Sequence, residues 1–368
     1  QTTAMSKKRI IISGGGTGGH LYPAVVLGQK LKELEPEIEL IYIGSQRAVE
    51  KRIMSEQSLT YLTLPVEGLK SHGWKKLKGL ALLPLALTRS LIIILSYQPA
   101  LVIGVGGFSS GPVVLLASLL KKPTLILEQN ALPGFTNRLL SHFADRAVVS
   151  FPSSLGYFRG KGILLGNPVR PEFYRIQRKQ PGPILTLLIF GGSQGSKFLN
   201  DRIIDSLPLL RELRNSLIIY HQTGERDFQR VKEAYELAGL DRVTVSPYFS
   251  PMADYLAAAD LVLCRAGATT CAELIAATRP AILVPFAAAA DNHQEWNARE
   301  LEQAGGAEVL LEKDFKPEIL LGRLKFYMNN HEALIRMGDN LQKLRRTDSA
   351  DRLARLALDM IKAERRRD

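Results

Sequence analysis

The feature that most constrains this chain is a local pattern that occurs once in each half: a short apolar strand, a glycine-rich turn and a helix. In the first half, residues 10–13 (IIIS) lead into residues 14–20 (GGGTGGH). In the second half, residues 185–190 (LTLLIF) lead into residues 191–197 (GGSQGSK). Glycines at such a junction let peptide N–H groups approach a phosphate at the helix N-terminus. The repeat therefore predicts two similar domains, each with a phosphate-type turn.

Further strands and helices alternate along both halves. Strands are expected at residues 40–43, 101–105 and 124–127, and again at residues 217–221, 243–245, 261–264 and 281–284. This alternation predicts parallel sheets covered by helices on both faces, with ligands bound beyond the carboxyl ends of the strands. We therefore expect an α/β fold with two Rossmann-like parallel-sheet domains that face a central cleft.

The length of 368 residues suits two domains, and the boundary is expected in an exposed connection. Residues 166–182 combine prolines with basic residues, which is typical of such a connection. The domains are placed at residues 6–167 and 168–345. A C-terminal helix is expected over residues 346–368, packed on the first domain or on the second, a choice that periodicity leaves open.

Composition and charge narrow the classes of partner. The net charge of +12 predicts attraction to an anion such as a phosphate, an acidic membrane or a nucleic acid. No zinc-finger spacing, aromatic RNA-binding motif or dense basic helix is visible, so no nucleic-acid partner is expected. Cys264 and Cys271 are interpreted as packing thiols of a cytoplasmic protein. No signal peptide is expected after Lys7 and Lys8, and polar residues and prolines interrupt residues 80–103, so no membrane span is predicted.

The first glycine-rich turn excludes two common nucleotide sites. Residues 14–19 satisfy G-x-G-x-x-G, but a dinucleotide site also needs an acidic residue after the second strand, where Gly44 and Ser45 stand. A P-loop needs a lysine where this chain has His20. His20 is instead a candidate general base, because imidazole titrates near neutral pH. The alternative is that His20 only stabilises the turn.

Polar residues follow other strands of both halves. Residues 104–111 form another glycine-rich turn, and residues 128–130 (EQN) place Glu128 and Asn130 in the same predicted crevice as His20. In the second half, small residues at 266–272 free peptide N–H groups for a diphosphate, and Glu273 could accept hydrogen bonds from a ribose. Alternatively, Glu273 only complements the helix dipole. Residues 291–297 could bind sugar hydroxyls, unless Gln294 is a solvated loop amide.

Taken together, these segments resemble the MurG family of glycosyltransferase family 28. Its members move N-acetylglucosamine from UDP to the muramic acid of undecaprenyl-linked lipid I, which gives lipid II for peptidoglycan. The matching segments are residues 14–20, 106–112, 128–130, 166–170, 191–195 and 265–273. The resemblance implies a GT-B fold, an inverting transfer to the C4 hydroxyl of the acceptor, donor binding mainly in the second half and acceptor binding in the first.

The resemblance also implies roles for individual residues. His20 would be the base, with Glu128 as the second candidate. The UDP-N-acetylglucosamine set would be Thr17, Gly18, Gly19, Asn130, Arg170, Ser193, Gln194, Phe249, Ala268, Thr269, Thr270, Glu273, His293 and Gln294. The acceptor set would be Gly16, Gly106, Gly107, Phe108 and Ser109. Within the donor set, Arg170 and Ser193 would contact the diphosphate and Phe249 would pack on uracil. Phe108 and Phe249 replace a frequent tyrosine and a frequent isoleucine of the family.

No D-x-D cluster is visible, and no metal or other cofactor is expected, because helix N-termini and Arg170 could stabilise the departing UDP. Basic and apolar residues alternate in a segment suited to an anionic leaflet. These membrane candidates are Trp74, Lys75, Lys76, Leu77, Lys78 and Leu80. An amphipathic helix that faces the core is the alternative. The expected location is the cytoplasmic face of the bacterial inner membrane, and the expected partners are UDP-N-acetylglucosamine, lipid I, the membrane surface and proteins of cell-wall synthesis.

Two rival functions remain at this level. One is another GT-B enzyme of UDP-sugars, such as a UDP-N-acetylglucosamine 2-epimerase or a transferase with a soluble acceptor. Product formed without an acceptor would favour the epimerase. The other is a non-catalytic membrane scaffold that keeps a nucleotide fold, against which the presence of His20, Glu128 and Glu273 argues.

Overall fold

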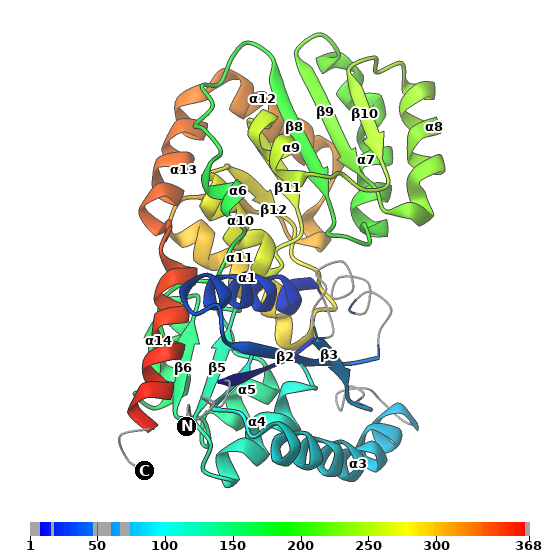
Figure 1. The fold of residues 1–368 in the computed structure, drawn as a ribbon. Coiled ribbons are helices and arrows are strands. Elements are labelled where there is room, and N and C mark those ends of the chain that lie inside the picture. Colours follow the sequence, from blue (N-terminus) through cyan, green and yellow to red (C-terminus); the bar gives the residue numbers. More distant parts are fainter. Residues whose placement is uncertain (1–7, 16–17, 47–49, 51–59, 67–73, 365–368) are drawn as a thin grey trace. The chain divides into compact units, whose positions relative to one another are not determined.

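The computed structural model describes residues 8–15, 18–46, 50, 60–66 and 74–364. The chain forms two compact units (Figure 1). Unit 1 comprises Gln1–Val169 and Asp348–Asp368, and unit 2 comprises Arg170–Thr347. The backbone therefore passes from one unit to the other twice, and its last segment belongs to the same unit as its first.

Unit 1 is built on a seven-stranded parallel sheet of order β3-β2-β1-β4-β5-β6-β7. Its strands are β1 (Arg9–Ser13), β2 (Glu39–Gly44), β3 (Thr60–Thr63), β4 (Leu101–Gly104), β5 (Thr124–Glu128), β6 (Arg146–Val149) and β7 (Gly162–Leu164). Its helices are α1 (Gly18–Leu34), α3 (Trp74–Tyr97), α4 (Ser110–Leu119), α5 (Phe135–Leu140), the 3₁₀ helix η1 (Pro152–Phe158) and α14 (Ser349–Glu364).

The three central residues of strand β1 are isoleucines because both faces of the sheet are covered. Ile10 and Ile12 pack into the cluster that contains residues of α1 and α14. Ile11 points the other way, into the cluster with residues of α3 and α4. Successive side chains of a strand alternate between its faces, so a run of three isoleucines predicts burial on both. The structure bears this out, since all three are almost fully buried.

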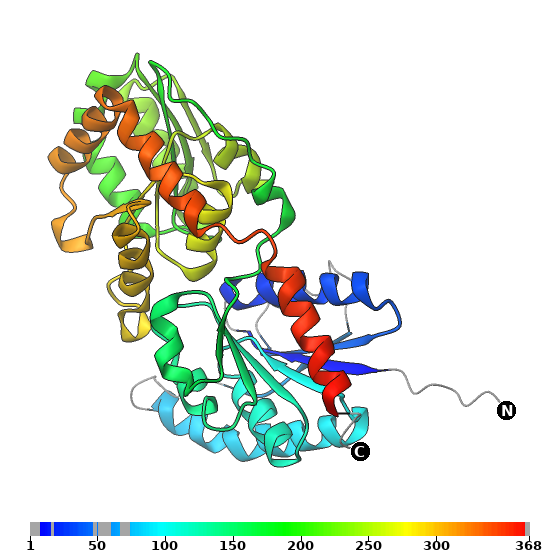
Figure 2. The same ribbon diagram turned by 90° about the vertical axis from the view of Figure 1, so that its left-hand side faces the viewer.

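The C-terminal helix α14 packs against unit 1, where it lies beside α1 (Figure 2). Its inward residues recur at helical spacing and are buried: Leu353, Ala354, Ala357 and Ile361. They join the same core cluster as Ile10 and Leu27. The choice that periodicity left open is thus resolved in favour of the first half of the sequence.

We expect Leu353→Ala to destabilise unit 1 by about 3 kcal/mol, because Leu353 is fully buried and its truncation leaves a cavity. The chain has two tryptophans, Trp74 in unit 1 and Trp296 in unit 2. Urea unfolding in a Trp296→Phe background would follow unit 1 through Trp74. The matched control is Leu95→Ala, because Leu95 is 52% exposed and its loss should cost less than about 0.5 kcal/mol. Equal losses in both variants would contradict the packing.

Unit 2 is built on a six-stranded parallel sheet of order β10-β9-β8-β11-β12-β13. Its strands are β8 (Leu185–Phe190), β9 (Leu217–Gln222), β10 (Val243–Ser246), β11 (Leu261–Cys264), β12 (Ala281–Leu283) and β13 (Ala307–Val309). Its α-helices are α6 (Pro171–Tyr174), α7 (Lys197–Leu210), α8 (Phe228–Ala238), α9 (Met252–Ala258), α10 (Ala268–Ala277), α11 (His293–Gln303), α12 (Pro317–Asn329) and α13 (His331–Leu344). Short 3₁₀ helices lie at η2 (Arg211–Leu213), η3 (Glu225–Asp227), η4 (Ala290–Asn292) and η5 (Glu312–Asp314).

Both sheets reverse their strand order next to the first strand of the unit. In unit 1 the order turns between β1 and β4, and in unit 2 it turns between β8 and β11. In open parallel sheets, this topological switch point opens a crevice beyond the carboxyl ends of the two strands, and ligands bind there. The predicted turns after residues 13, 104, 190 and 264 all leave the strands that flank the two switch points. The fold therefore gives each unit one preferred ligand position.

Two details differ from the sequence-based expectations. Strands β3, β6, β7 and β13 were not predicted. Residues 166–182 are not a fully exposed connection, because Phe173 is buried in the short helix α6. Among the residues that the structure describes, no helix has the combined length and apolarity needed to cross a bilayer.

Candidate functional site

The switch point of unit 1 is formed by two glycine-rich turns in close contact. The N–H of Gly15 donates to the carbonyl oxygen of Gly106 at 3.3 Å, and the Ser13 hydroxyl donates to the carbonyl of Ser109 at 3.1 Å. Gly107 has a φ of +81°, and a Cβ there would lie 2.1 Å from the Gly15 oxygen. A larger residue at position 107 would therefore separate the two turns.

His20 lies in the first turn of α1, at this switch point. Its Nδ1 is 3.1 Å from Oε1 of Gln129, and Nε2 of Gln129 donates to the carbonyl oxygen of Val105 at 3.1 Å. Val105 follows β4 and Gln129 follows β5, and these two strands are neighbours in the sheet. Sequence reasoning missed Gln129 as a site residue, although its place between Glu128 and Asn130 was the available signal.

Glu128 has a structural task at the end of β5. Its Oε1 accepts hydrogen bonds from the backbone N–H and the side-chain amide of Asn130, at 2.9 and 3.1 Å. Its Oε2 accepts from the N–H of Gly134 at 3.0 Å and from the Asn137 amide at 2.9 Å. The carboxylate is 2% exposed. These four donors occupy both oxygens and orient Asn130, so the geometry favours His20 over Glu128 as the base.

Several sequence predictions fall where the structure gives no side-chain description. Gly16 and Thr17 lie outside the described residues, and Gly18 and Gly19 begin α1. The membrane candidates from Trp74 to Leu80 form the first turns of α3, whose side chains there are likewise outside the description. Phe108 is half-buried in the second glycine-rich turn, and Ser109 is almost fully buried.

The switch point of unit 2 presents two helix N-termini. Helix α7 begins after the turn at residues 191–196, where the Ser196 hydroxyl caps the helix by accepting from the N–H of Leu199. Gly195 has a φ of +74°, and a Cβ there would lie 1.9 Å from the carbonyl oxygen of Thr223. The predicted diphosphate ligand Ser193 and its neighbour Gln194, predicted to bind UDP-N-acetylglucosamine, are exposed on this turn. The turn can therefore offer peptide N–H groups to an anion.

Helix α10 supplies the second N-terminus. It begins at Ala268 directly after β11, so Thr269 and Thr270 occupy its first turn as predicted from the sequence. Ala268, Thr269 and Thr270 are all partly accessible. The partial positive charge of a helix N-terminus favours a bound phosphate. Strands β8 and β11 are adjacent and parallel, so α7 and α10 both start at the same edge of the sheet.

Glu273 and Arg170, both predicted as donor ligands, form an ion pair within unit 2. Nη2 of Arg170 lies 3.3 Å from Oε1 of Glu273. Glu273 is in the second turn of α10, and its side chain is 14% exposed. Burial raises the pKa of this carboxyl to about 7, while the charge of Arg170 acts in the opposite direction. The pair thus holds a carboxylate whose ionisation changes near neutral pH.

Two buried residues that the sequence analysis missed, Gln222 and Arg265, hold the turn at residues 191–196 of unit 2 in place. The Gln222 amide donates to the carbonyl of Gly192 at 2.9 Å and accepts from the N–H of Phe249 at 2.8 Å. Arg265 directly follows β11, donates to the Ser196 hydroxyl at 3.1 Å and pairs with Glu312 at 2.6 Å. The signal for Arg265 was its position, as the first residue after a buried strand.

The prediction that Phe249 packs on uracil needs correction. Its ring is 2% exposed and stacks on Tyr255 with centroids 3.8 Å apart, and Tyr220 packs against its edge. These neighbours enclose the ring, so the Phe249 side chain belongs to the core.

The predicted sugar ligands His293 and Gln294 begin helix α11 and are partly exposed. Oε1 of Gln294 accepts a hydrogen bond from the N–H of Phe286 at 3.0 Å. That contact fixes the orientation of the amide, so its NH₂ group is the end that can donate. Gln294 is therefore more than a solvated loop amide.

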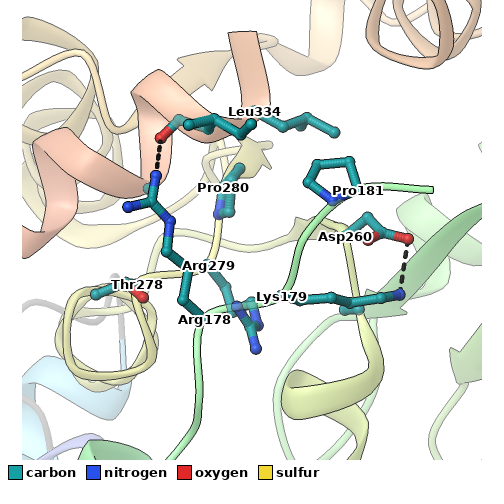
Figure 3. Close-up of a pocket in the computed structure, with 11 residues that line it drawn as sticks. Arg178, Lys179, Pro181, Asp260, Thr278, Arg279, Pro280 and Leu334 are labelled. Atoms are coloured by element: carbon teal, nitrogen blue, oxygen red, sulfur yellow. Dashed lines mark hydrogen bonds and ion pairs between the residues drawn. The ribbon is translucent and has the colours of Figure 1, made fainter. Parts of the chain in front are cut away.

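A pocket elsewhere in unit 2 has a structural explanation (Figure 3). It lies at the amino ends of β11 and β12, whereas helix α10 begins beyond the carboxyl end of β11. Lys179 pairs with the buried Asp260 at 2.8 Å, and Asp260 also accepts from the N–H of Thr186 at 2.7 Å. Arg279 donates to the carbonyl of Leu256 at 2.6 Å. Through the Lys179–Asp260 ion pair, the segment that precedes β8 is attached to the sheet of unit 2.

A buried histidine makes unit 2 sensitive to acid. His221 is fully buried between the Tyr235 hydroxyl, 3.1 Å from Nδ1, and Oδ1 of Asn200, 3.0 Å from Nε2. Burial lowers its pKa to about 3. Because the unfolded chain takes up this proton near pH 6.5, the stability from neutral His221 is complete above that pH and is lost as the pH falls toward 3.

We therefore expect unit 2 to lose about 2 kcal/mol of unfolding free energy through His221 between pH 6.5 and pH 5. Urea unfolding in a Trp74→Phe background would measure this through Trp296. The His221→Gln variant should have a smaller slope with pH, whereas the exposed control His142→Gln should keep the wild-type slope. An unchanged slope in His221→Gln would refute the assignment.

Comparison with solved structures identifies the fold class as GT-B. A crystal structure of Acinetobacter baumannii MurG aligns with a TM-score of 0.76 at 28% identity, over 96% of this chain and 99% of that one. A UDP-glucosyltransferase from Polygonum tinctorium aligns with a TM-score of 0.72 at 13% identity, over 97% and 99% of the two chains, and shows the fold alone. The predicted architecture of two Rossmann-like parallel-sheet domains is thus confirmed.

The chain belongs to glycosyltransferase family 28, in the MurG family. The N-terminal domain of glycosyltransferase family 28 matches residues 10–149, and the C-terminal domain of that family matches residues 186–353. A curated protein of Anaeromyxobacter sp. (strain Fw109-5) is 40% identical over 96% of this chain and 94% of its own length. One from Syntrophotalea carbinolica is 39% identical over 95% and 98%. Both are named UDP-N-acetylglucosamine–N-acetylmuramyl-(pentapeptide) pyrophosphoryl-undecaprenol N-acetylglucosamine transferase.

Proposed function

We propose that this protein transfers N-acetylglucosamine from UDP-N-acetylglucosamine to the C4 hydroxyl of the muramic acid in lipid I, which forms lipid II. The observation that supports this most strongly is similarity over nearly the whole chain to transferases named for these substrates. The sites agree with it, since unit 2 has two helix N-termini for a diphosphate and unit 1 has an imidazole at its switch point.

Unit 2 is the proposed donor domain. The exposed turn with Ser193 and the first turn of α10 would bind the diphosphate through peptide N–H groups. Arg170 would add positive charge, and Glu273 would accept hydrogen bonds from the ribose hydroxyls. The free NH₂ group of the Gln294 amide would donate to a sugar oxygen.

Unit 1 is the proposed acceptor domain, with His20 as general base. The imidazole would remove the proton from the C4 hydroxyl as that oxygen attacks C1 of N-acetylglucosamine. The bond from C1 to the UDP oxygen breaks in the same step, and the configuration at C1 inverts from α to β. Asn130, oriented by Glu128, would contact the transferred sugar.

The charge that develops on UDP needs stabilisation from groups already in place. The N-termini of α7 and α10, together with Arg170, can supply it without reorganisation. In the part of the chain that the structure describes, no three His, Cys, Asp or Glu side chains cluster as metal ligands. That no metal or cofactor is required stays a prediction, which the transfer assay below tests when a chelator is added.

Contact with an anionic membrane surface is supported by helix α3. Leu85, Ile92 and Leu95 are each more than 50% exposed, and their spacing of seven and three residues places them on one side of the helix. At the end of the neighbouring helix α4, Leu119 is 63% exposed and is followed by Lys121 and Lys122. An apolar stripe with nearby basic residues suits a peripheral position at the cytoplasmic face.

This surface predicts binding to vesicles that contain anionic lipid. The triple variant Leu85→Ser, Ile92→Ser, Leu95→Ser should bind such vesicles at least about tenfold more weakly in a flotation assay. It removes the exposed apolar side chains of α3 that would enter the membrane surface. Leu237→Ser is the control, since Leu237 is 91% exposed but lies on α8 of unit 2. If the triple variant floats as well as wild type, α3 is not the contact.

A transfer assay tests the proposed function directly. The full chain is incubated with labelled UDP-N-acetylglucosamine, with and without a short-chain lipid I analogue, and with and without EDTA. Labelled lipid II formed only with the acceptor supports the proposal. Conversion of the sugar nucleotide without an acceptor would instead identify a 2-epimerase, and transfer only when soluble sugars replace the lipid I analogue would identify a soluble-acceptor transferase.

A further inference from the structure

The side chain of Gln129 connects the candidate base to the backbone of unit 1. It is 1% exposed and makes two hydrogen bonds, one at each end of its amide. Its Nε2 lies 3.1 Å from the carbonyl oxygen of Val105, and its Oε1 lies 3.1 Å from Nδ1 of His20.

The Val105 carbonyl fixes the polarity of this chain of hydrogen bonds. A peptide carbonyl oxygen can only accept, so the group that faces it must be the NH₂ of Gln129. The opposite orientation would place two acceptors 3.1 Å apart inside the protein, which is costly. The carbonyl oxygen of the Gln129 amide therefore faces His20, and the proton between them belongs to Nδ1 of the imidazole. A neutral imidazole carries one N–H, so its lone pair is then on Nε2.

Gly106 allows this contact to form. It has a φ of +92°, and a Cβ at this position would lie 2.9 Å from both Cε1 and Nδ1 of His20. The same Cβ would be 3.6 Å from Oε1 of Gln129. The ring is thus placed by residues that follow two adjacent strands, Val105 and Gly106 after β4 and Gln129 after β5. A frame of this kind is rigid enough to select one tautomer.

We propose that Gln129 is a positioning residue that holds the imidazole of His20 in the tautomer protonated on Nδ1, so that Nε2 presents the lone pair that accepts the acceptor's proton. The catalytic half of this inference rests on the proposed function of His20 as general base. The structural half, the tautomer itself, stands on the geometry of unit 1 alone and can be measured without turnover.

The direct test is ¹⁵N NMR of the full chain labelled on histidine, at about pH 8.5, roughly two units above the ordinary histidine pKa. The chain has six histidines, and the spectrum of His20→Asn assigns the His20 signals. We expect a protonated Nδ1 and an unprotonated Nε2 in the wild type. A proton on Nε2 would overturn the proposal, whatever the behaviour of any Gln129 variant.

The variant Gln129→Met keeps the length of the side chain but removes both hydrogen bonds. We expect mixed His20 tautomers, a fall in kcat of about tenfold or more and a nearly unchanged KM for UDP-N-acetylglucosamine. The control Gln29→Met, exposed on α1, should resemble wild type. A retained Nδ1–H tautomer in Gln129→Met would refute the positioning role. Mixed tautomers with full activity would support the tautomer assignment and count against His20 as the base.

Discussion

Replacing His20 with alanine is expected to lower kcat by a factor of about 10² to 10⁴, the range typical for loss of a general base. The dissociation constant for UDP-N-acetylglucosamine should change by less than about twofold, because most of the proposed donor contacts are in unit 2 and His20 is assigned to the acceptor. Steady-state transfer to a lipid I analogue gives kcat, and calorimetric titration with the donor gives the dissociation constant.

The matched control for this prediction is His142→Ala. His142 belongs to the same unit, but its side chain is exposed and lies after α5, so its loss should leave kcat unchanged. Asn at position 20 is a second useful variant, because it keeps a polar side chain but cannot take up a proton. Wild-type kcat in both His20 variants would show that His20 is not the general base. The family assignment would be unaffected.

The second large effect is expected at Glu273. The Glu273→Ala variant should bind UDP-N-acetylglucosamine about 10- to 100-fold more weakly, because it loses charge-assisted hydrogen bonds and leaves Arg170 without this carboxylate. The change should appear in the dissociation constant and in KM more than in kcat. Glu300→Ala is the control, since Glu300 lies on α11 of the same unit and has not been placed at the site.

The raised pKa of Glu273 gives this prediction a pH dependence. In the proposed complex, ribose hydroxyls donate to the ionised carboxylate, and burial raises the pKa of that carboxyl to about 7 in the free protein. Donor affinity should therefore weaken as the pH falls below 7, where Glu273 takes up a proton before binding. Glu273→Gln should bind weakly at every pH and lose most of this dependence. A wild-type pH profile in Glu273→Gln would show that another group is responsible.

Much of the fold could be predicted because its signals are local. Three isoleucines in β1 indicate a strand buried on both faces, and the turns after β1 and β8 have the glycines that close approach requires. Strand β13 gave no such signal, since Ala307–Val309 includes a glutamate and spans only three residues. Its place in the sheet depends on pairing with β12, which is a contact distant in sequence.

The same contrast between local signals and contacts distant in sequence applies to the site. Position after a strand was enough to make His20 and Glu273 candidates, because parallel sheets gather such residues at one edge, whereas Ser193 was proposed from the family resemblance. It could not show that Glu128 uses both oxygens within unit 1 or that the Phe249 ring stacks on Tyr255. Hydrogen-bond partners and ring neighbours depend on three-dimensional packing, so they became visible only in the structure.

The return of α14 to unit 1 bears on how the polypeptide matures during translation. Unit 1 needs Leu353, Ala357 and Ile361 to complete the core around α1, yet these residues emerge from the ribosome only after all of unit 2. Until then the nascent unit 1 exposes the apolar side of α1 that α14 later covers, and chains with such an exposed apolar surface are prone to aggregate. A stop codon near the 3′ end of the coding sequence would therefore damage the domain that is made first.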